Sequence, residues 1–567
     1  MTVPTRAHGP AAALLLALAT ACTPAASTRP APSPRPASAP GATAQAAPQG
    51  NTGTTSAPKT AAKASPAAPA GPEEAPPAWQ RLDPDRDGVQ GTRVDRALSE
   101  LLATRRPQRR VVVAVIDGGV DTLHPQLRPI LWTNEREVAG NGVDDDRNGF
   151  VDDVHGWSVI PKLPGDTGRY DTMEMTRLHA ACRGLPAGRG TPRPDDAQCG
   201  AVAKAFAEQA GETQQMAMQL GAIRGMYTGT VTRLRAAMRT DTLTAARVRA
   251  FTPTTGEETN AKTMWLRLDA AGIDSAALHG AGEQLAASKF QLDTMFDPRG
   301  VPHDPKGSND VMGPDATHGT HVAGIIGAQA RADGSGRGIA PNVAIMAVRA
   351  VPDGDERDAE VARAIRYAAD NGAQVINMSF GKGYSPGKPA VDSAVRYAAE
   401  KGVLMVHAAG NDGADNDHVP SFPTRRLADG TDVPNWIEVG ALSWKGGAQL
   451  PAEFSNYGAQ MVDLFSPGVD IRSTVPGGGM EENSGTSMAA PVVSGVAALL
   501  LAYFPELTPT QVGRIIVETA RPLRDLEVVR PGEDGATVRF GALSRTGGVV
   551  DAYAAVQRAL QLTRPVP

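Results

Sequence analysis

The run Val111–Ile116 is unbroken, apolar and mostly β-branched. Such a strand is typical of a parallel sheet buried on both faces, because a half-exposed strand alternates apolar and polar residues. The pattern predicts further strands at 343–348, 374–378 and 403–407. It predicts helices at about 318–330, 359–370, 388–401 and 486–504. Alternating strands and helices predict an α/β fold: a three-layer sandwich with a mostly parallel central sheet and helices on both faces.

Four polar residues stand at the ends of these elements. Asp117 directly follows the first strand, and Asn411 follows the strand at 403–407. His318 and Ser487 each lie in the first turn of an expected helix, where free backbone N–H groups and the helix dipole favour negative charge. Ligands of open α/β sheets bind beyond the carboxyl ends of the strands, so we expect one common site. A hydroxyl, an imidazole, a carboxylate and an amide are the groups that nucleophilic acyl transfer needs.

The motifs around these residues are VIDGGVD, HGTHVAG, NMSFG, AAGN and GTSMAAP. Together, in the chain order Asp, His, Ser, they resemble the subtilisin-like serine endopeptidases, or subtilases, over roughly residues 78 to 560. The resemblance implies that Asp117, His318 and Ser487 form a catalytic triad. It also implies that Asn411 and the Ser487 backbone N–H stabilise the oxyanion. The chemistry then requires no cofactor.

The resemblance assigns substrate binding to two backbone segments that pair with an extended peptide. They are Ser379, Phe380 and Gly381, and Ala408, Ala409 and Gly410. One departure concerns Gly118, since subtilases often carry Ser or Thr directly after the catalytic aspartate. The missing hydroxyl lowers the rate by tenfold at most, about 1.4 kcal/mol, because the carboxylate itself is present.

The leading function is hydrolysis of peptide bonds in proteins or peptides outside the cytoplasm. One alternative is a peptide-binding scaffold with an inactive triad, and another is a processing protease dedicated to one partner. The chain has 567 residues and a formal net charge of −5, which argues against nucleic acid as a partner.

Residues 1–21 carry the features of an export signal, with Arg6 before a short apolar region. Cys22 follows Ala19-Thr20-Ala21, which resembles a bacterial lipobox and predicts a lipid anchor on Cys22 that holds the protein at a membrane. Plain secretion after cleavage is the alternative. Residues 22–77 are rich in Ala, Pro, Ser and Thr and predict a disordered tether.

An insertion separates the Asp and His motifs. We expect residues 78–158 to be the lead-in and first part of the catalytic domain, 159–313 a mainly helical insertion, and 314–567 the remainder. Both flanking motifs meet at the active site, so we expect the insertion to wall or cap substrate entry. Its two cysteines, Cys182 and Cys199, are expected to form a disulfide in an exported protein.

The segment 141–153 is dense in oxygen donors. Four of its side chains occupy positions one, three, five and nine of an EF-hand loop: Asp144, Asp146, Asn148 and Asp152. His155 stands at position twelve, where an EF-hand carries Glu, so the loop is not an EF-hand. The cluster predicts either a structural Ca²⁺ site or a solvated acidic turn with Arg147 as counter-charge.

Overall fold

The computed structural model describes residues 74–160, 169–187, 191–273, 275–299, 307–532 and 535–563. The predicted signal segment, Cys22 and most of the predicted tether lie outside these residues. Contacts divide the described chain into two units, of which the smaller is Tyr227–Ala277. The larger unit holds the central sheet and is formed by Ala70–Met226 and Leu278–Pro567.

The centre of the larger unit is a nine-stranded sheet in the order β10-β13-β7-β6-β5-β4-β1-β3-β2. Every neighbouring pair is parallel except β10 with β13. The predicted, mostly parallel sheet is therefore confirmed. The strands are β1 (Val111–Asp117), β2 (Gly156–Ser158), β3 (Val343–Arg349), β4 (Val375–Met378), β5 (Leu404–Ala408), β6 (Trp436–Leu442), β7 (Leu464–Pro467), β10 (Arg521–Pro522) and β13 (Gly548–Val549).

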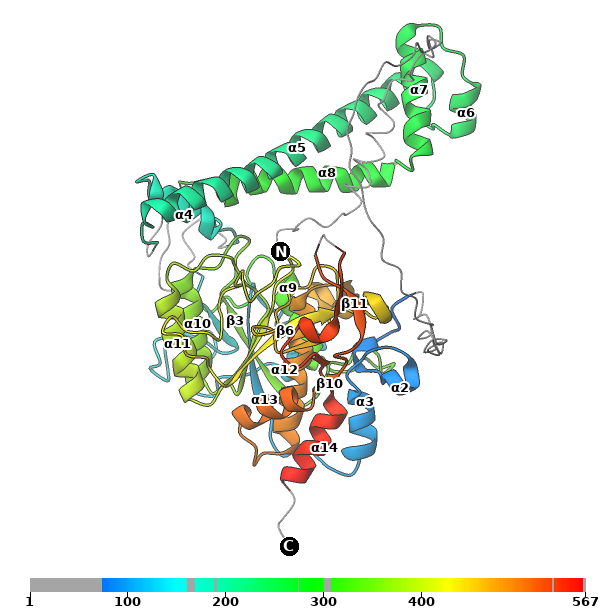
Figure 1. Ribbon diagram of the computed structural model, residues 1–567. Helices are drawn as coiled ribbons and strands as arrows, with labels where there is room; N and C mark the ends of the chain where they lie inside the picture. The colour runs from blue at the N-terminus through cyan, green and yellow to red at the C-terminus, as the bar shows by residue number, and fades with distance from the viewer. Residues whose placement is uncertain are drawn as a thin grey trace, which may run out of the picture. The chain divides into compact units, whose positions relative to one another are not determined.

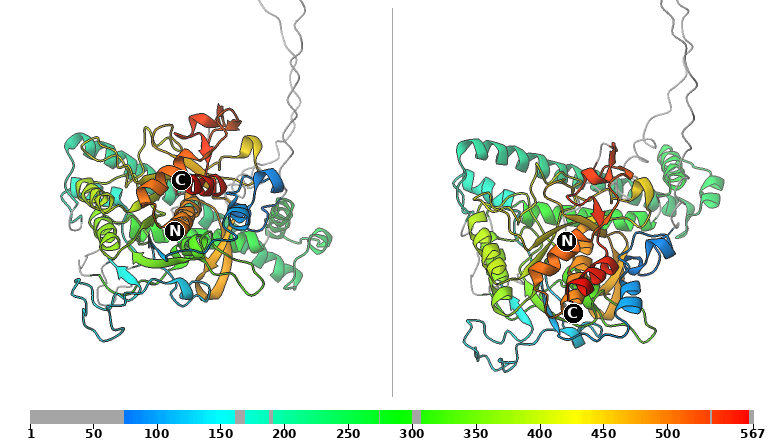
Figure 2. Two further views of the ribbon diagram at one scale, coloured as in Figure 1. Left: turned by 90° about the horizontal axis from the view of Figure 1, so that it is seen from below. Right: turned by 60° about the horizontal axis from the view of Figure 1, so that its bottom comes forward.

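Helices cover both faces of this sheet (Figure 1). On one face, α10 (Asp358–Asp370) and α11 (Lys388–Glu400) pack side by side, and their apolar residues join one core cluster with inward residues of β3, β4 and β5. On the other face, α9 (Thr317–Gly327) and α12 (Thr486–Tyr503) belong to a second cluster. Figure 2 shows the same three layers from two further directions.

The long helix α12 lies in the core of the larger unit. Of all described helices it alone has the length and apolar composition to cross a membrane, and 94% of that stretch is buried inside the protein. Its apolar side chains therefore form core. α13 (Pro509–Glu518) and α14 (Ala552–Leu562) extend the same cluster.

Shorter elements surround the sheet. Two hairpins pair antiparallel, β8 (Ile471–Val475) with β9 (Gly479–Asn483) and β11 (Glu527–Val529) with β12 (Thr537–Arg539). The remaining short helices are η1 (Trp79–Arg81), α2 (Pro84–Asp87), α3 (Val94–Arg96), η2 (Ala97–Leu101), η3 (Arg128–Ile130), η5 (Gly447–Gln449), η6 (Pro476–Gly478) and η7 (Phe540–Ala542).

The residues between β2 and α9 are mainly helical where they are described. The helices are α4 (Glu174–Cys182), α5 (Asp196–Met238), α6 (Ala245–Ala250), α7 (Gly256–Ala270), α8 (Ser275–Phe290) and η4 (Gln291–Met295). α5 runs through the boundary of the two units. The smaller unit has its own apolar cluster, which includes Leu234, Val248 and Trp265.

Cys182 ends α4 and Cys199 lies in the first turn of α5. Their sulfurs form a disulfide, with the two Cα atoms 5.6 Å apart. The bridge joins the end of α4 to the first turn of α5, and both cysteines belong to the larger unit.

Candidate active site

Asp117 is the last residue of β1 and is buried. Its Oδ1 accepts a hydrogen bond from the Gly118 backbone N–H at 2.7 Å and lies 2.8 Å from His318 Nδ1. Its Oδ2 is also buried but has no hydrogen-bond partner among the described residues. One oxygen of the carboxylate therefore orients the imidazole, while the other lacks the contact that a hydroxyl beside it could supply.

His318 is the second residue of α9, and its side chain is 30% exposed. The helix approaches β1 closely because residue 319 is glycine. A Cβ on Gly319 would lie 2.2 Å from the Gly119 carbonyl oxygen and 3.1 Å from Asp117 Cβ. The small residue in the HGTH motif thus permits the contact between His318 and Asp117.

Ser487 is the second residue of α12 and is 5% exposed. Its Oγ donates to the Ser379 carbonyl at 3.1 Å, and its own carbonyl accepts from Ser379 Oγ at 3.0 Å. A hydroxyl has one proton to donate, so Ser487 does not donate to His318 in this state. Proton transfer to the imidazole requires rotation of the Ser487 side chain, and catalytic hydrogen bonds often tighten only when substrate binds.

Asn411 follows β5 and is oriented by Thr486, the residue before Ser487. Asn411 Oδ1 accepts from the Thr486 backbone N–H at 2.9 Å and from the Thr486 hydroxyl at 3.0 Å. The Thr486 hydroxyl accepts in turn from the Gly410 N–H at 3.2 Å. Because the amide oxygen is held by Thr486, the amide nitrogen of Asn411 is the end that can donate to negative charge beside Ser487.

The two segments assigned to substrate binding follow neighbouring parallel strands, β4 and β5. Ser379 and Phe380 are buried, whereas Gly381 is exposed. Gly410 has a φ of +111°, and a Cβ there would lie 2.4 Å from Asn456 Nδ2. A Cβ on Gly381 would likewise lie 2.5 Å from Ser421 Oγ, so a larger residue at either position would displace a neighbouring side chain.

A layer of hydrogen bonds that supports Ser487 was not predicted from the sequence. Asn377 in β4 donates to Ser379 Oγ at 3.0 Å and accepts from Ser494 Oγ at 2.8 Å. These contacts fix Ser379. Its carbonyl accepts from the Ser487 hydroxyl, and its hydroxyl donates to the Ser487 carbonyl. The only available signal was a polar residue in the otherwise apolar strand Val375–Met378.

Two other buried histidines are bound elsewhere. His321 Nε2 lies 3.0 Å from the Glu481 carbonyl, and burial lowers its pKa to about 4, so the ring is neutral at pH 7. His407 Nδ1 lies 2.8 Å from Glu438 Oε1 and is completely buried. Both side chains are structural, in line with their absence from the motif pattern.

The acidic loop brings three carboxylates together. One oxygen each from Glu137, Asp144 and Asp146 lies within 4.8 Å of the others, in a partly buried setting. Glu137 precedes the segment singled out from the sequence. Asp146 also pairs with Arg136 at 2.8 Å.

The other two residues predicted as ligands make different contacts. Asp152 accepts from the backbone N–H groups of Gly140, Asn141 and Gly142 at 2.8–3.2 Å. Asn148 Oδ1 accepts from the Phe150 N–H at 2.8 Å. Asp144, Asp146 and Glu137 also accept backbone N–H groups of this loop, but among the described residues they alone form the cluster of three carboxylates.

A carboxylate at a strand end, an imidazole at one helix start and a hydroxyl at another, around a parallel sheet, are the groups that a serine hydrolase uses. A sequence profile of the subtilase family matches residues 108–542. The chain therefore belongs to the subtilase family of serine proteases.

Individual relatives are similar over part of the chain. It is 44% identical over 184 residues to a thermophilic serine proteinase of Bacillus sp. (strain AK1), covering 32% of this chain and 42% of that protein. It is 40% identical over 251 residues to the cell wall-associated protease of Bacillus subtilis (strain 168), covering 44% of this chain and 26% of that protein. It is 33% identical over 299 residues to subtilisin BL of Lederbergia lenta, covering 51% of this chain and 97% of that protein.

Proposed function

We propose that this protein is a serine endopeptidase that hydrolyses peptide bonds of proteins or peptides outside the cytoplasm. The observation that carries the proposal is the 2.8 Å contact between Asp117 Oδ1 and His318 Nδ1. With a carboxylate accepting at Nδ1, that nitrogen carries the proton and Nε2 is left as the acceptor. Nε2 is the position from which a histidine takes the proton of a serine hydroxyl.

The reaction proceeds in two acyl-transfer steps. Ser487 Oγ leaves Ser379, attacks the scissile carbonyl and gives its proton to His318. His318 then protonates the leaving amine, and the acyl-enzyme is hydrolysed by water activated in the same way. Asp117 keeps its charge throughout and stabilises the imidazolium.

Negative charge on the carbonyl oxygen is stabilised by Asn411 and the Ser487 N–H. The support for Asn411 is the pair of hydrogen bonds from Thr486 to its Oδ1. A donor held in this way needs no reorganisation when the oxyanion forms, which is the condition for efficient electrostatic catalysis.

The substrate class is an extended polypeptide that pairs with the backbone of Ser379–Gly381 and Ala408–Gly410. Pairing through the main chain tolerates many side chains. The proposed setting is the cell exterior, with a lipid anchor on Cys22 or as a secreted protein. One relative is by name a cell wall-associated protease.

A structural Ca²⁺ ion is proposed at Glu137, Asp144 and Asp146. Three carboxylates at this separation repel one another, Arg136 pairs with Asp146 alone, and Ca²⁺ prefers such oxygen ligands. Adding Ca²⁺ should raise the thermal midpoint of the wild type but not of Glu137→Gln/Asp144→Asn. Equal responses in both proteins would count against the site.

The endopeptidase proposal is tested by digestion of casein, with cleavage sites mapped by mass spectrometry. We expect internal cleavages by the wild type and none by Ser487→Ala. A wild type that binds casein without cleaving it would favour the peptide-binding scaffold instead. Cleavage of one native protein but not of casein would favour a dedicated processing protease.

A further inference from the structure

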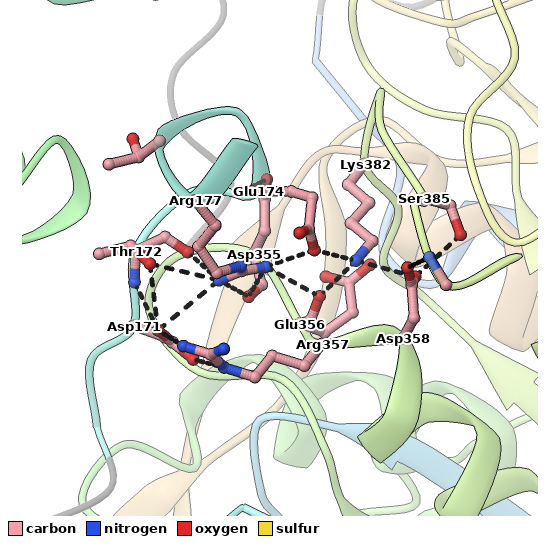
Figure 3. A network of polar contacts seen from close by, with 12 residues as sticks. Asp171, Thr172, Glu174, Arg177, Asp355, Glu356, Arg357, Asp358, Lys382 and Ser385 are labelled. Atoms are coloured by element: carbon pink, nitrogen blue, oxygen red, sulfur yellow. Dashed lines mark hydrogen bonds and ion pairs between the residues drawn. The ribbon is translucent and has the colours of Figure 1, made fainter. Parts of the chain in front are cut away.

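The start of the insertion is joined to the catalytic part by a buried ionic network (Figure 3). Three acidic and three basic side chains form its ion pairs: Asp171, Glu174, Asp358, Arg177, Arg357 and Lys382. Asp355 and Glu356 contribute their backbone carbonyls, and the Asp355 carboxylate accepts from the Glu174 N–H. Asp171, Glu174 and Arg177 belong to the insertion, and the others follow β3 and β4. Removing one partner of a buried ion pair is strongly destabilising, because the other charge is then left uncompensated in the protein interior.

Lys382 lies at the centre of this network. Its ammonium group donates to Glu174 Oε2 at 2.8 Å and to the Glu356 carbonyl at 2.7 Å, and lies 3.0 Å from Asp358 Oδ1. Its side chain is 2% exposed. An ammonium group has three protons, so every donor of Lys382 is engaged, one of them by the insertion.

Lys382 directly follows the proposed substrate-binding segment. Ser379 marks the scissile end of that segment, since its carbonyl accepts from the nucleophile Ser487. Three residues of extended chain, at about 3.3 Å each, separate Ser379 from Lys382 by about 10 Å. Gly381 is exposed and Lys382 is buried. The backbone of Lys382 pairs with Phe422. A peptide paired with this segment therefore ends, about three residues from its scissile bond, beside the residue whose side chain contacts the insertion.

A second contact ties the same segment to the insertion. Tyr384 packs against an apolar cluster that contains Met175, Leu178, Val202 and Phe296, all of them insertion residues. The chain between Lys382 and Tyr384 is thus held by one ionic and one apolar contact with the insertion.

The insertion is also attached on the histidine side. Arg169 pairs with Asp315 at 3.3 Å and with Asp353 at 3.0 Å. Asp315 lies three residues before His318. The insertion is therefore bound next to the start of α9 through Arg169 and next to the residue that follows Gly381 through Glu174.

We propose that Lys382 is a positioning residue that couples the insertion to the substrate-binding segment. The insertion then forms the subsite about three residues from the scissile bond and determines how far an extended peptide is bound. This inference rests on the proposed endopeptidase function. It assigns to the insertion a defined place in the groove.

The experiment uses two series of internally quenched peptides with one scissile bond. One series extends from two to five residues on the N-terminal side, and the other on the C-terminal side. On the side of the scissile bond that runs along Ser379–Gly381, kcat/KM of the wild type should rise when the third and fourth residues are added. The variants are Lys382→Met/Glu174→Gln, which removes both buried charges together, Lys382→Arg and Tyr384→Ala.

We expect the double variant to lose about tenfold in kcat/KM on the long peptides of that side, mainly through KM, because it loses ground-state binding. Short peptides should be cleaved within about twofold of the wild-type rate. Tyr384→Ala should show the same pattern to a smaller extent, and Lys382→Arg should retain most of the gain. Lys388→Met is the matched control, since Lys388 pairs with Asp392 and the Arg426 carbonyl and touches no insertion residue among its described contacts.

A fluorophosphonate probe that labels Ser487 separates the two proposals. Normal labelling of the variants with equal losses on short and long peptides would overturn the coupling, as would unchanged cleavage of long peptides in both the double variant and Tyr384→Ala. Absence of labelling in the wild type would instead overturn the endopeptidase function and the inference with it. If the double variant does not fold, Tyr384→Ala decides, because it leaves no buried charge unpaired.

Discussion

The carboxylate of Asp117 is incompletely satisfied. Its Oδ2 is buried without a described hydrogen-bond partner, and Gly118 follows where related enzymes often carry a hydroxyl. A Cβ on Gly118 would lie 3.2 Å from the Val351 carbonyl oxygen, which is tight but can be relieved by a small shift. Residue 118 is therefore a place where one added hydroxyl can improve the site.

We predict that Gly118→Ser raises kcat/KM by up to about tenfold, because a hydroxyl beside Asp117 holds the carboxylate in its charged, oriented form. Steady-state kinetics on one peptide substrate measure the change. Gly119→Ser serves as the contrast, because its Cβ would lie 2.2 Å from the Met312 carbonyl oxygen at a φ of +143° and should impair folding. A lower rate for Gly118→Ser in a normally folded protein would contradict the prediction.

A second prediction concerns the oxyanion donor. Asn411→Ala should lower kcat by roughly 10²–10³ with little change in KM, since the lost hydrogen bond forms only in the transition state. Thr486→Val should cause a smaller loss, because it removes only one of the two contacts that orient Asn411. A tenfold or larger rise in KM for Asn411→Ala would indicate a role in ground-state binding instead.

At the scale of elements, the junction between the insertion and the sheet contains a carboxyl group that is neutral near pH 7. Burial raises the pKa of Glu356 to about 8, although the charge of Lys382 opposes the shift and Asp355 and Asp358 add to it. Glu174 behaves differently. Burial would raise its pKa, but Arg177 and Lys382 lower it overall. The junction contains more acidic than basic residues, and Glu356 is an acid that keeps its proton near pH 7.

The third prediction follows from linkage. Between its ordinary pKa of 4.5 and about 8, folded Glu356 holds a proton that the unfolded chain has released. The contribution of this group to the free energy of unfolding therefore falls as pH rises through that window. Glu356→Gln should abolish this part of the pH dependence and be most stabilising, relative to wild type, near pH 8. Denaturant unfolding at pH 5, 6.5 and 8 measures it, and parallel curves for the two proteins would refute it.

The fourth prediction concerns the disulfide between α4 and α5. Cys182 and Cys199 are 17 residues apart, and a loop of that length is stabilised by about 3 kcal/mol in the chain-entropy model. Cys182→Ser/Cys199→Ser should therefore increase amide hydrogen exchange in α4 and the first turns of α5. Exchange in β1 and α12 should be unchanged, because the sheet and its covering helices do not depend on this bridge. Uniform acceleration throughout the chain would show that the insertion does not open by itself.

At the scale of the whole molecule, the catalytic fold follows closely from local sequence signals. Each of the four predicted strands agrees with the structure to within one residue at either end, since buried apolar runs bounded by polar turn residues leave little freedom. The predicted helices over the active site, the start of α9 and of α12, are confirmed for the same reason. Asp117, His318 and Ser487 lie at one end of the sheet because the first ends a strand and the other two begin helices there.

The features that sequence reasoning missed depend on pairing between distant residues. Glu174 and Lys382 are 208 positions apart, and neither lies in a pattern that indicates burial. Glu137 joins Asp144 and Asp146 only because the loop folds back, while the carboxylate of Asp152 is taken by backbone N–H groups. Such contacts depend on tertiary structure, so composition and periodicity do not predict them.

The proposed endopeptidase activity requires that Ser487 is an activated nucleophile. The direct measurement is intact-mass analysis after treatment with a fluorophosphonate probe, with Ser487→Ala and His318→Ala beside the wild type. We expect one added probe on wild-type Ser487, none on Ser487→Ala, and much slower labelling of His318→Ala. A wild type that stays unlabelled, or that labels as fast without His318, would contradict the proposed activity.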